Sequence, residues 1–550
     1  MSVKPLPLCL SLLTVGVSLQ PSASAREVPD NYSCYNTNAV AIDDWSSADI
    51  GALAQATRQV GGQSLRLPGG DTANYWDWDR GGVIEWYTNG QPRQPLTFPY
   101  FFPEELPVSL NFQFGTNATL ANVKPLVTGA DAEPIWVMNM ISSTLDKELR
   151  HLQEAADLGM PVTRVELGNE LYFGLPNYTR PGFNENEPLQ RGVPTPADYA
   201  SKAKDWAIAV KDAFPNADIA ITGVSPSANS EQRIKDWLPA LQVRTGSDNR
   251  SALEVVDAFT LHPYYSTASL GITKSDVGNR ARAGEIARDG ISAQRGLIKN
   301  PALRAPQFQD KQLWITEHNV IEDAEVVLGN SWVHALMMDV QTQDFLQDER
   351  TEVSCAHVLT GNPQWQAIAN ENGLAIDPDR RGVDNRPFGE VAEQFETTAT
   401  GIVLGQTAEI FDDGEAELVL SEEAAIGWLV DDGELTLSIV NANDESTSYF
   451  LPEGEIWEVL TYTGDPWATI MADTELDISL DELVGGSLLN IPAFSKIIAK
   501  ADPNASRPEA PDSKSVPEPA TAVGIGLATA AMVLSRRKQK KEDVDARFSR

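Results

Sequence analysis

The sequence predicts an α/β chain in which a (β/α)8 TIM barrel is followed by an antiparallel β-sandwich domain. Up to residue 394, short apolar runs alternate with longer amphipathic segments, as expected of repeated strand and helix units around a parallel sheet. From residue 395 to 500 the runs are short, alternate in polarity and are separated by turn signals, which indicates antiparallel strands. With 550 residues and 42% hydrophobic content, the chain can bury a large core in more than one domain.

Eight candidate strands precede residue 395. They are Ala39–Ile42, Ser64–Leu67, Pro134–Met140, Val162–Leu167, Ile219–Thr222, Val255–His262, Gln312–Thr316 and Val353–Leu359. Between them lie segments with apolar residues at helical spacing, such as Ala197–Phe214 and Trp332–Phe345. Eight strands with intervening helices over residues 26–394 fit a closed barrel with insertions. A doubly wound open sheet is the alternative, but no glycine-rich phosphate-binding motif follows an early strand.

The segment 395–500 contains four clear strand candidates and no helical segment comparable to those of the barrel. The candidates are Ala416–Leu420, Leu435–Asn441, Ile456–Tyr462 and Lys496–Ala499. No catalytic group stands out in this β-sandwich, so we expect it to support the barrel, with carbohydrate binding as the alternative.

Residues 1–25 have the pattern of a secretory signal peptide. Lys4 precedes a largely apolar run from Leu6 to Leu19, and Ala23-Ser24-Ala25 matches the small-x-small cleavage pattern. We therefore expect an exported chain that begins near Arg26.

Cleavage at that point would remove Cys9 and leave Cys34 and Cys355. Cys34 lies near the first predicted strand and Cys355 in the eighth, which are neighbours once a barrel closes. A disulfide across this seam is a hypothesis that suits an exported protein, and two buried free thiols are the alternative.

The C-terminal end combines a linker, an apolar run and a basic cluster. Residues 501–519 are rich in Pro, Ser, Ala and Asp, and within 520–550 the apolar run Ala520–Leu534 is followed by five Lys and Arg residues. The run is shorter than the roughly 20 residues that span a bilayer, although its basic flank is a positive-inside signal. Together with Val516-Pro-Glu-Pro519, this tail resembles the PEP-CTERM sorting signal. The resemblance implies processing by an exosortase-type enzyme and delivery to the cell surface or extracellular matrix, and a plain transmembrane helix anchor is the alternative.

The charge balance excludes one large class of partners. The chain has 42 basic and 78 acidic residues and a net charge of −36. Such a field repels polyanions, so nucleic acid is not expected as a partner.

Two glutamates follow strands that a closed barrel would bring together. Glu170 ends the motif Gly168-Asn169-Glu170 after the fourth predicted strand, and Glu317 follows the seventh. In a barrel of this kind the loops at the C-terminal ends of the strands carry the chemistry. Two carboxyl groups about 5–5.5 Å apart on one rim would suit a retaining glycosidase, in which one donates a proton and the other attacks. The alternative is that both are structural, as a helix cap and a loop ion pair.

Further polar and aromatic residues at the strand ends are candidates for substrate binding. They are Arg66, Asn74, Asn139, Asn169, His262, Tyr264 and Trp365. Arg66 and Tyr264 could keep Glu317 ionised. His262 could instead be a hydrogen-bonded core histidine, and Trp365 could be either a sugar-stacking platform or rim packing. His318 and His357 are too isolated in sequence to indicate a metal site.

The motifs Arg66-x-Pro-Gly-Gly70, Gly168-Asn-Glu170 and His262-x-Tyr264 resemble those of clan A retaining glycoside hydrolases. They are most similar to α-L-arabinofuranosidases and more distantly to β-glucuronidase and heparanase-like enzymes. The resemblance implies that Glu170 is the general acid/base, Glu317 the nucleophile and Asn169 a contact to the sugar 2-hydroxyl, supported by Arg66, His262 and Tyr264. It also implies a secreted hydrolase of polysaccharides or oligosaccharides that uses no cofactor and no metal.

Two departures from the arabinofuranosidase pattern leave the sugar open. These are the aromatic cluster Asn74–Trp78 and the insertion Asn177–Pro194 after the acid/base. β-Glucuronidase-like and β-xylosidase-like activities are therefore alternatives, and a galactoside is a further possible substrate. A different class of function is a carbohydrate-binding surface or matrix protein with an inactive barrel.

Overall fold

A computed structural model describes residues 25–502 of the chain, with internal gaps. The gaps are 40–41, 43–44, 46–48, 84–86, 89–90, 93–116, 142, 174–194, 225–231, 267–269, 299–307, 322–327, 361–364, 370–394, 412–414, 421–424, 432–433, 452–454 and 469–475. The predicted signal peptide, apart from Ala25, and the predicted sorting tail lie outside the described residues, as does the insertion Asn177–Pro194. No helix within the described ranges is long and apolar enough to span a membrane.

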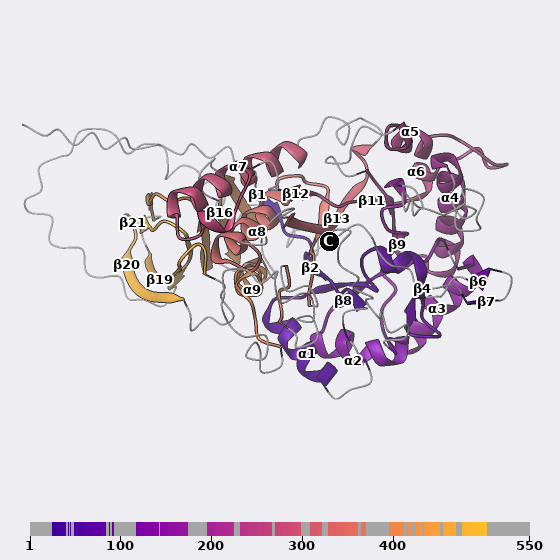
Figure 1. The fold of residues 1–550 in the computed structure, drawn as a ribbon, viewed down its shortest axis with the longest axis horizontal. Helices are drawn as coiled ribbons and strands as arrows, with labels where there is room; N and C mark the ends of the chain where they lie inside the picture. The colour runs from indigo at the N-terminus through magenta and orange to yellow at the C-terminus, as the bar shows by residue number, and fades with distance from the viewer. Residues whose placement is uncertain are drawn as a thin grey trace, which may run out of the picture.

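Eight parallel strands close into a barrel (Figure 1). They are β2 (Ser33–Asn36), β3 (Ser64–Leu67), β8 (Glu133–Met138), β9 (Arg164–Leu167), β10 (Asp218–Thr222), β11 (Ala258–Leu261), β13 (Gln312–Ile321) and β14 (Thr351–Ala356). Each pairs with the next in this order, and β14 pairs back with β2. The short strand β12 (Tyr264–Ser266) adds a further parallel pairing to the end of β13. The predicted (β/α)8 barrel is confirmed.

Seven of the eight predicted strands coincide with barrel strands, and the prediction of the first was wrong. The first barrel strand is β2, which lies earlier in the chain than the predicted Ala39–Ile42. The sequence of β2, Ser-Cys-Tyr-Asn, lacks an apolar run, yet all four residues are buried. Two of its side chains, Cys34 and Asn36, make their contacts with other strands, so the local pattern did not reveal it.

Helices surround the barrel and link its strands. They are α1 (Asp49–Gln59), α2 (Leu120–Ala130), α3 (Leu145–Asp157), α4 (Pro196–Ala213), α5 (Gln232–Leu241), α6 (Ala252–Val255), α7 (Arg280–Ile298), α8 (Trp332–Phe345) and α9 (Ala399–Phe411). Local sequence explains their starts. Thr195, for example, forms a capping box with Asp198 and precedes a proline in the first turn of α4.

The lower interior of the barrel is apolar, and polar groups lie above it. Buried residues from six strands form one interior cluster: Cys34, Ile135, Ala220, Ala258, Trp314, Val353 and Cys355. Side chains alternate along a strand, so the residue two positions further on faces the same interior. On β2, β3 and β9 this places Asn36, Arg66 and Glu166 toward the C-terminal rim, where the barrel interior becomes charged.

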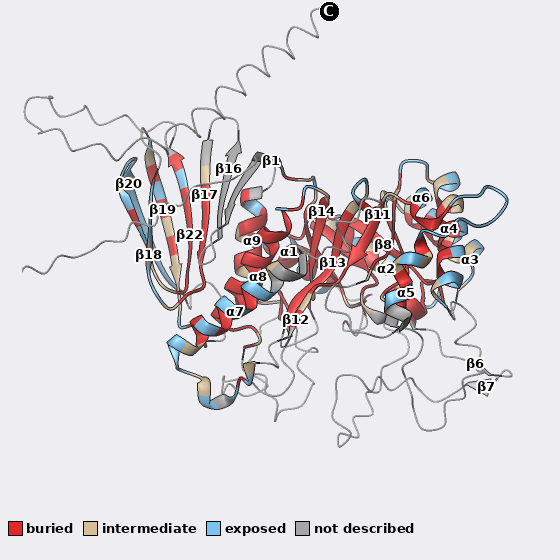
Figure 2. Cartoon of the chain, turned by 90° about the horizontal axis from the view of Figure 1, so that it is seen from above, coloured by how far each residue is buried: buried red, intermediate tan, exposed pale blue. Residues whose placement is uncertain are grey.

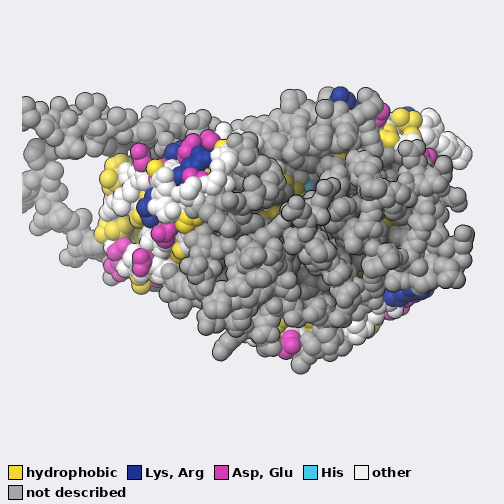
Figure 3. Space-filling view, viewed as in Figure 1, with side chains coloured by type: hydrophobic (Ala, Val, Ile, Leu, Met, Phe, Trp, Pro, Cys, Tyr) yellow, Lys and Arg dark blue, Asp and Glu magenta, His cyan; other side chains and the backbone are white. Residues whose placement is uncertain are grey.

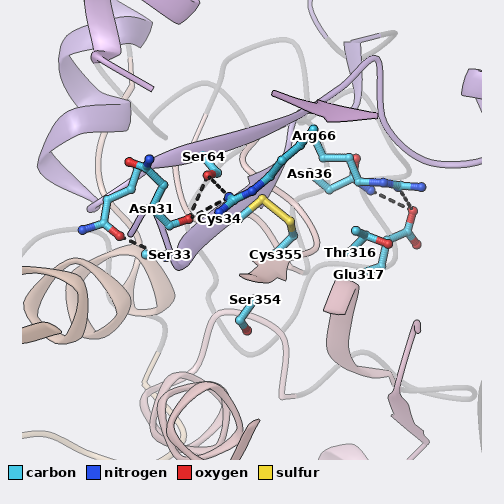
Figure 4. Close-up of a disulfide and its surroundings, with 12 residues drawn as sticks. Asn31, Ser33, Cys34, Asn36, Ser64, Arg66, Thr316, Glu317, Ser354 and Cys355 are labelled. Atoms are coloured by element: carbon cyan, nitrogen blue, oxygen red, sulfur yellow. Dashed lines mark hydrogen bonds and ion pairs between the residues drawn. A yellow bond between two sulfur atoms is a disulfide. The ribbon is translucent and has the colours of Figure 1, made fainter. Parts of the chain in front are cut away.

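The seam between β14 and β2 carries a disulfide. Cys34 and Cys355 are directly paired in the strand register and are covalently joined, with their Cα atoms 4.0 Å apart (Figure 4). The predicted cross-link is thus present, and it ties the first and last strands of the barrel together.

A second domain of antiparallel strands packs beside the barrel (Figure 2). Its strands are β1 (Ala25–Glu27), β15 (Glu415–Leu420), β16 (Ala425–Asp431), β17 (Glu434–Asn441), β18 (Thr447–Phe450), β19 (Ile456–Thr463), β20 (Asp477–Val484), β21 (Leu488–Ile491) and β22 (Ser495–Asp502). Seven form one sheet in the order β1-β15-β16-β17-β22-β19-β20, and β18 pairs with β21. Apolar residues of the large sheet, including Trp457 and Ile497, pack with Leu489 and Ile491 of β21 in a separate core.

The beginning of this second segment differs from the prediction. Helix α9 occupies Ala399–Phe411, where an all-strand pattern was expected. Its sequence, ATGIVLGQTAEIF, contains two glycines and five β-branched residues, which lower its helix propensity. The helix is stabilised by burial, since most of its described side chains are buried. Strand β1, in turn, extends across the expected cleavage position after Ala25.

Helix α8 lies between the two domains, and all its residues are buried. At this boundary, Lys496 of β22 contacts Asp339 of α8 at 2.5 Å and Thr407 of α9 at 2.5 Å. Neither charged side chain is exposed. The Trp332 indole of α8 also donates to the Phe494 carbonyl at 2.8 Å. The barrel and the sandwich are therefore joined through a buried ion pair.

The outer edge of the sandwich exposes apolar side chains between acidic ones (Figure 3). The exposed large hydrophobic residues there are Phe450, Ile478, Leu480, Val484 and Leu488. Strand β20 ends the large sheet and also exposes Asp477, Asp481 and Glu482. Charges on an edge strand oppose pairing with the edge of another sheet.

Reduction of the Cys34–Cys355 disulfide should lower the melting temperature. The bond joins residues 321 positions apart and restricts the unfolded chain, and native disulfides typically contribute about 2–4 kcal/mol. Thiol titration of the denatured protein should find two more thiols after reduction than before. A variant with both cysteines replaced by serine should melt at the same temperature with and without reductant. Equal thiol numbers before and after reduction would contradict the bond.

Candidate active site

Glu317 faces the barrel interior because β13 has an irregularity at this point. The register pairs Ile315 with Ser354 and His318 with Ala356, so two residues of β13, Thr316 and Glu317, lie opposite one residue of β14. An extra residue of this kind re-aims side chains near a site. Both side chains are buried and both make contacts within the barrel.

Among the described residues, three donors hold the Glu317 carboxylate, and Figure 4 shows Arg66 and Asn36 beside it. Arg66 Nη1 and Asn36 Nδ2 donate to Oε1 at 2.6 Å and 2.9 Å, and the Tyr264 hydroxyl donates to Oε2 at 2.7 Å. Burial alone would raise the pKa of Glu317, but His262, His357, Arg66 and the Tyr264 hydrogen bond lower it to about 2. This carboxylate is therefore ionised over the ordinary pH range.

Arg66 joins Glu317 to strand β9. Its Nε and Nη2 donate to the two oxygens of Glu166 at 2.7 Å and 2.9 Å, and Nη2 also donates to Asn169 Oδ1 at 2.6 Å. Burial lowers the pKa of Arg66, but the carboxylates of Glu166 and Glu317 outweigh this and raise it. Arg66 is a permanently charged group that fixes three neighbours at once.

The turn Gly168-Asn169-Glu170 after β9 has a constrained shape. Gly168 has a φ of +81°, and a Cβ atom there would lie 2.6 Å from the Leu171 side chain. Asn74 then clamps the turn from the loop after β3. Its Nδ2 donates to the Asn169 carbonyl at 2.7 Å, and its Oδ1 accepts from the Asn169 N–H at 2.9 Å. Asn74 thus positions the turn rather than contacting either rim carboxylate.

Glu170 has a different environment from Glu317. Its Oε1 accepts from the Tyr172 hydroxyl at 2.9 Å and lies 2.9 Å from His262 Nδ1. The Glu170 side chain is 19% exposed, compared with 6% for Glu317. One carboxyl group is thus open to the rim, and the other is enclosed by donors.

The two glutamates lie next to each other. One oxygen of Glu170, one oxygen of Glu317 and one ring nitrogen of His262 all lie within 4.8 Å of one another. A pair of carboxyl groups about 5–5.5 Å apart is typical of direct nucleophilic attack, whereas about 6.5–9.5 Å leaves room for an intervening water. The shorter separation therefore fits the retaining arrangement.

His262 connects the two carboxyl groups to the interior. Its Nε2 lies 2.9 Å from Thr316 Oγ1, while Nδ1 is 3.7 Å from Glu317 Oε2 in addition to its contact with Glu170. Burial lowers the pKa of His262, but the charge of Glu317 and the hydrogen bond with Glu170 raise it overall.

His357 directly follows β14 and lies beside Glu317 and Asn36. Its Nδ1 is 2.7 Å from Asn36 Nδ2 and 3.9 Å from Glu317 Oε2. Its ring lies 6.0 Å from the rings of Tyr264 and Trp365. Burial lowers the pKa of His357, which favours the neutral ring, and a neutral Nδ1 can accept from Asn36.

The structure brings most of the sequence-predicted site residues together. Glu170, Glu317, Arg66, Asn169, His262 and Tyr264 form one connected network. Trp365 borders it through His357, and Asn74 supports it through the backbone. Asn139 donates to the Trp76 carbonyl at 3.0 Å and so holds the loop after β3.

Four residues of this network were not among the predicted site residues: Asn36, Glu166, Tyr172 and His357. Glu166 had a usable signal, because it is an acidic residue between two apolar ones, Val165 and Leu167, in a predicted strand. His357 is isolated in the sequence, which gives no signal of its contact with Asn36 or Glu317. Asn36 gave no signal, since its strand was misplaced.

Two groups of side chains within the described residues have the spacing of metal ligands. They are Glu170 with His262 and Glu317, and Asp77 with Asp79 and His151. In the first, the Arg66 guanidinium already contacts Glu317. In the second, Lys147 contacts both aspartates, and Arg150 contacts Asp79 at 2.7 Å. A bound cation would have to displace or tolerate these positive charges, so we assign no metal to either group.

Comparisons with known proteins place the fold. No family model and no curated protein sequence match the chain. A family 51 α-L-arabinofuranosidase from Bifidobacterium longum has a TM-score of 0.60 at 15% identity, over 88% of this chain and 100% of that chain. An α-L-arabinofuranosidase from Thermotoga maritima has a TM-score of 0.57 at 15% identity, covering 87% and 98%. A 4-O-α-L-rhamnosyl-β-D-glucuronidase from Fusarium oxysporum has 0.52 at 13% identity, covering 87% and 98%. At these identities the likeness is one of fold.

Replacing Tyr264 with Phe should destabilise the protein in a pH-dependent way. A folded-state pKa of about 2, against an ordinary value of 4.5, means that Glu317 contributes stability above pH 4.5 that is lost as pH falls toward 2. Loss of one hydrogen bond to a charged group costs about 1.5–3 kcal/mol. The difference in unfolding free energy between wild type and variant should therefore be largest above pH 4.5 and shrink below it, as measured by urea unfolding.

The neighbouring Tyr265 provides a matched control. It is buried against Gly290 of α7. The unfolding free energy of the Tyr265→Phe variant should differ from that of the wild type by the same amount at every pH in this range. If the loss of unfolding free energy in Tyr264→Phe also does not change with pH, then Tyr264 does not lower the pKa of Glu317.

Proposed function

We propose that this protein is a retaining glycoside hydrolase that cleaves O-glycosidic bonds of a polysaccharide or oligosaccharide by double displacement. The observation that carries the proposal is the closeness of the Glu170 and Glu317 carboxyl groups, which have oxygens within 4.8 Å of each other, Glu170 in the turn after β9 and Glu317 within β13. Their contrasting environments support it, because double displacement needs one ionised carboxylate and one proton donor.

In the proposed first step, Glu317 attacks the anomeric carbon while Glu170 protonates the departing oxygen. The bond from the anomeric carbon to the leaving group breaks as a glycosyl ester to Glu317 forms. Arg66, Asn36 and Tyr264 keep Glu317 ionised and oriented for this attack.

In the proposed second step, Glu170 accepts a proton from a water molecule, which attacks the same carbon and releases Glu317. Two inversions give net retention of configuration. Asn169 is the proposed contact to the sugar 2-hydroxyl, with its Oδ1 held by Arg66. Trp365 is the proposed aromatic wall of the sugar site, beside His357.

For the substrate we propose an α-L-arabinofuranoside. The support is the motif resemblance together with fold neighbours that are α-L-arabinofuranosidases. A β-glucuronide is the second candidate, because a glucuronidase is also among the neighbours, and a β-xyloside is the third. A carbohydrate-binding protein with an inactive barrel is less well supported, since binding alone does not require the paired glutamates.

Replacing Glu317 with Ala should abolish hydrolysis of aryl glycosides. Azide should then restore cleavage, because this small anion can enter the vacated space and attack the anomeric carbon. The product should be a glycosyl azide of inverted configuration, identified by NMR, whereas the wild type releases sugar of retained configuration. The rate of the wild type across aryl arabinofuranosides, glucuronides and xylosides identifies the sugar.

A control variant is Glu154→Ala on the exposed surface of α3, where the side chain is 49% exposed. It should hydrolyse the best substrate at the wild-type rate. A Glu317→Ala variant with full activity, or a wild type that inverts configuration, would disprove the assigned nucleophile.

We also propose that the protein is exported and delivered to the cell surface or extracellular matrix. The support is the signal-peptide pattern of residues 1–25 and the PEP-CTERM-like pattern of residues 501–550, which implies an exosortase-type partner and a membrane-associated stage before processing. N-terminal sequencing of protein recovered from the cell surface should begin near Arg26. Surface protein that still contains Cys9 would contradict the proposed cleavage.

A further inference from the structure

We propose that Thr316 is a positioning residue that fixes the tautomer of His262 and thereby keeps a proton available to Glu170. The proposal rests on the proposed role of Glu170 as the acid/base. Its basis is a chain of four side chains that runs from the barrel interior to the rim: Glu166, Thr316, His262 and Glu170.

The direction of hydrogen bonding in this chain is set at its buried end. Both oxygens of Glu166 accept from Arg66, so this carboxylate acts as an acceptor. A carboxylate can only accept, so in the proposed arrangement the Thr316 hydroxyl donates its single hydrogen to Glu166 Oε1, at 3.4 Å. Its oxygen then accepts from His262 Nε2, at 2.9 Å. Consequently the Nε2 atom of His262 carries a hydrogen.

The state of Nε2 decides what His262 offers to Glu170. In a neutral ring with a hydrogen on Nε2, the other nitrogen, Nδ1, is an acceptor. Nδ1 lies 2.9 Å from Glu170 Oε1, so a hydrogen bond between them requires the proton on Glu170. If the proton moves to Nδ1, the ring becomes an imidazolium paired with a carboxylate. In either case one proton is held between these two atoms.

The opposite tautomer would work against acid catalysis. A neutral ring with its hydrogen on Nδ1 would donate to Glu170 and favour the carboxylate form, which has no proton to give. Thr316 excludes this tautomer because its oxygen would then face a bare Nε2 while its hydrogen is engaged by Glu166. The glycosidic oxygen would take the proton from Glu170, and the attacking water would later return one.

The charges around His262 are compatible with a shared proton. Within the described part of the chain, the charged and titratable groups that face it include Glu170, Glu317, Arg66, His357 and, through Thr316, Glu166. Burial lowers the pKa of His262, and the two rim carboxylates more than offset this. The hydroxyls of Tyr172 and Tyr264 donate to those carboxylates and not to the ring.

Thr316 is suited to this role by its place in β13. The register irregularity turns it inward next to Glu317, and it is fully buried, so it acts through His262 rather than on the substrate. Valine has nearly the same shape without the hydroxyl, while serine keeps the hydroxyl and loses a methyl group. The two substitutions therefore separate hydrogen bonding from packing.

The test compares Thr316→Val with Thr316→Ser. In Thr316→Val, the basic limb of the pH profile of kcat/KM should move to lower pH by about 1 unit, since one hydrogen bond of about 1–1.5 kcal/mol is lost. The rate should fall about tenfold on a glycoside with a poor leaving group and change little on an activated aryl glycoside, because only the former needs the acid. In Thr316→Ser, which keeps the hydroxyl, the basic limb of the kcat/KM profile should stay at the wild-type pH.

A basic limb that stays in place in Thr316→Val would overturn the proposal. Equal rate losses on both leaving groups would also overturn it, because they would indicate a packing defect. If the wild type hydrolyses no glycoside, the proposed function fails. The hydrogen-bonded chain from Glu166 to Glu170 can then be tested by 15N NMR of labelled histidines. The signals of His262 are identified by their loss in the His262→Gln variant. If Nε2 of His262 carries a hydrogen in the wild type but not in Thr316→Val, Thr316 fixes the tautomer as proposed. Identical spectra of the two proteins would refute this role of Thr316.

Discussion

The charge of one buried arginine organises the upper layer of this barrel. Arg66 has no exposed surface, and a buried cation is costly unless it is paired and fully hydrogen-bonded. Glu166, Glu317 and Asn169 provide those partners from β9, β13 and the turn after β9. Because the guanidinium group is planar and rigid, it fixes the relative positions of these three groups. The geometry of both rim glutamates depends on that arrangement.

The site separates two chemically identical side chains by their surroundings. Glu317 is enclosed by an arginine, an amide and a phenol, all of which donate to it. Glu170 instead shares its contacts with an imidazole and a single hydroxyl and is more open to the rim. The backbone produces the difference, since one glutamate follows a glycine-dependent turn and the other lies in a strand irregularity.

The sequence allowed prediction of the barrel, seven of its strands and the paired glutamates, because these depend on hydrophobic periodicity and on residues at strand ends. Features that depend on distant partners were harder to predict. Strand β2 is polar in sequence and is stabilised by Cys355, Glu317 and the barrel interior. Helix α9 forms through burial against its intrinsic propensity. Glu166 is visible in the sequence as an acidic residue between apolar ones, but its partner Arg66 belongs to a different strand and only the fold brings the two together.

The buried contact between Lys496 and Asp339 limits how the two domains could be recombined. Asp339 belongs to the barrel helix α8, and its cation comes from the last strand of the sandwich. A foreign sandwich without a lysine at that place would leave an aspartate buried without a counter-ion, at a cost of about 3–5 kcal/mol. The sandwich is therefore not an interchangeable module. A change of sandwich would have to supply a cation for Asp339 or be accompanied by a substitution of that aspartate.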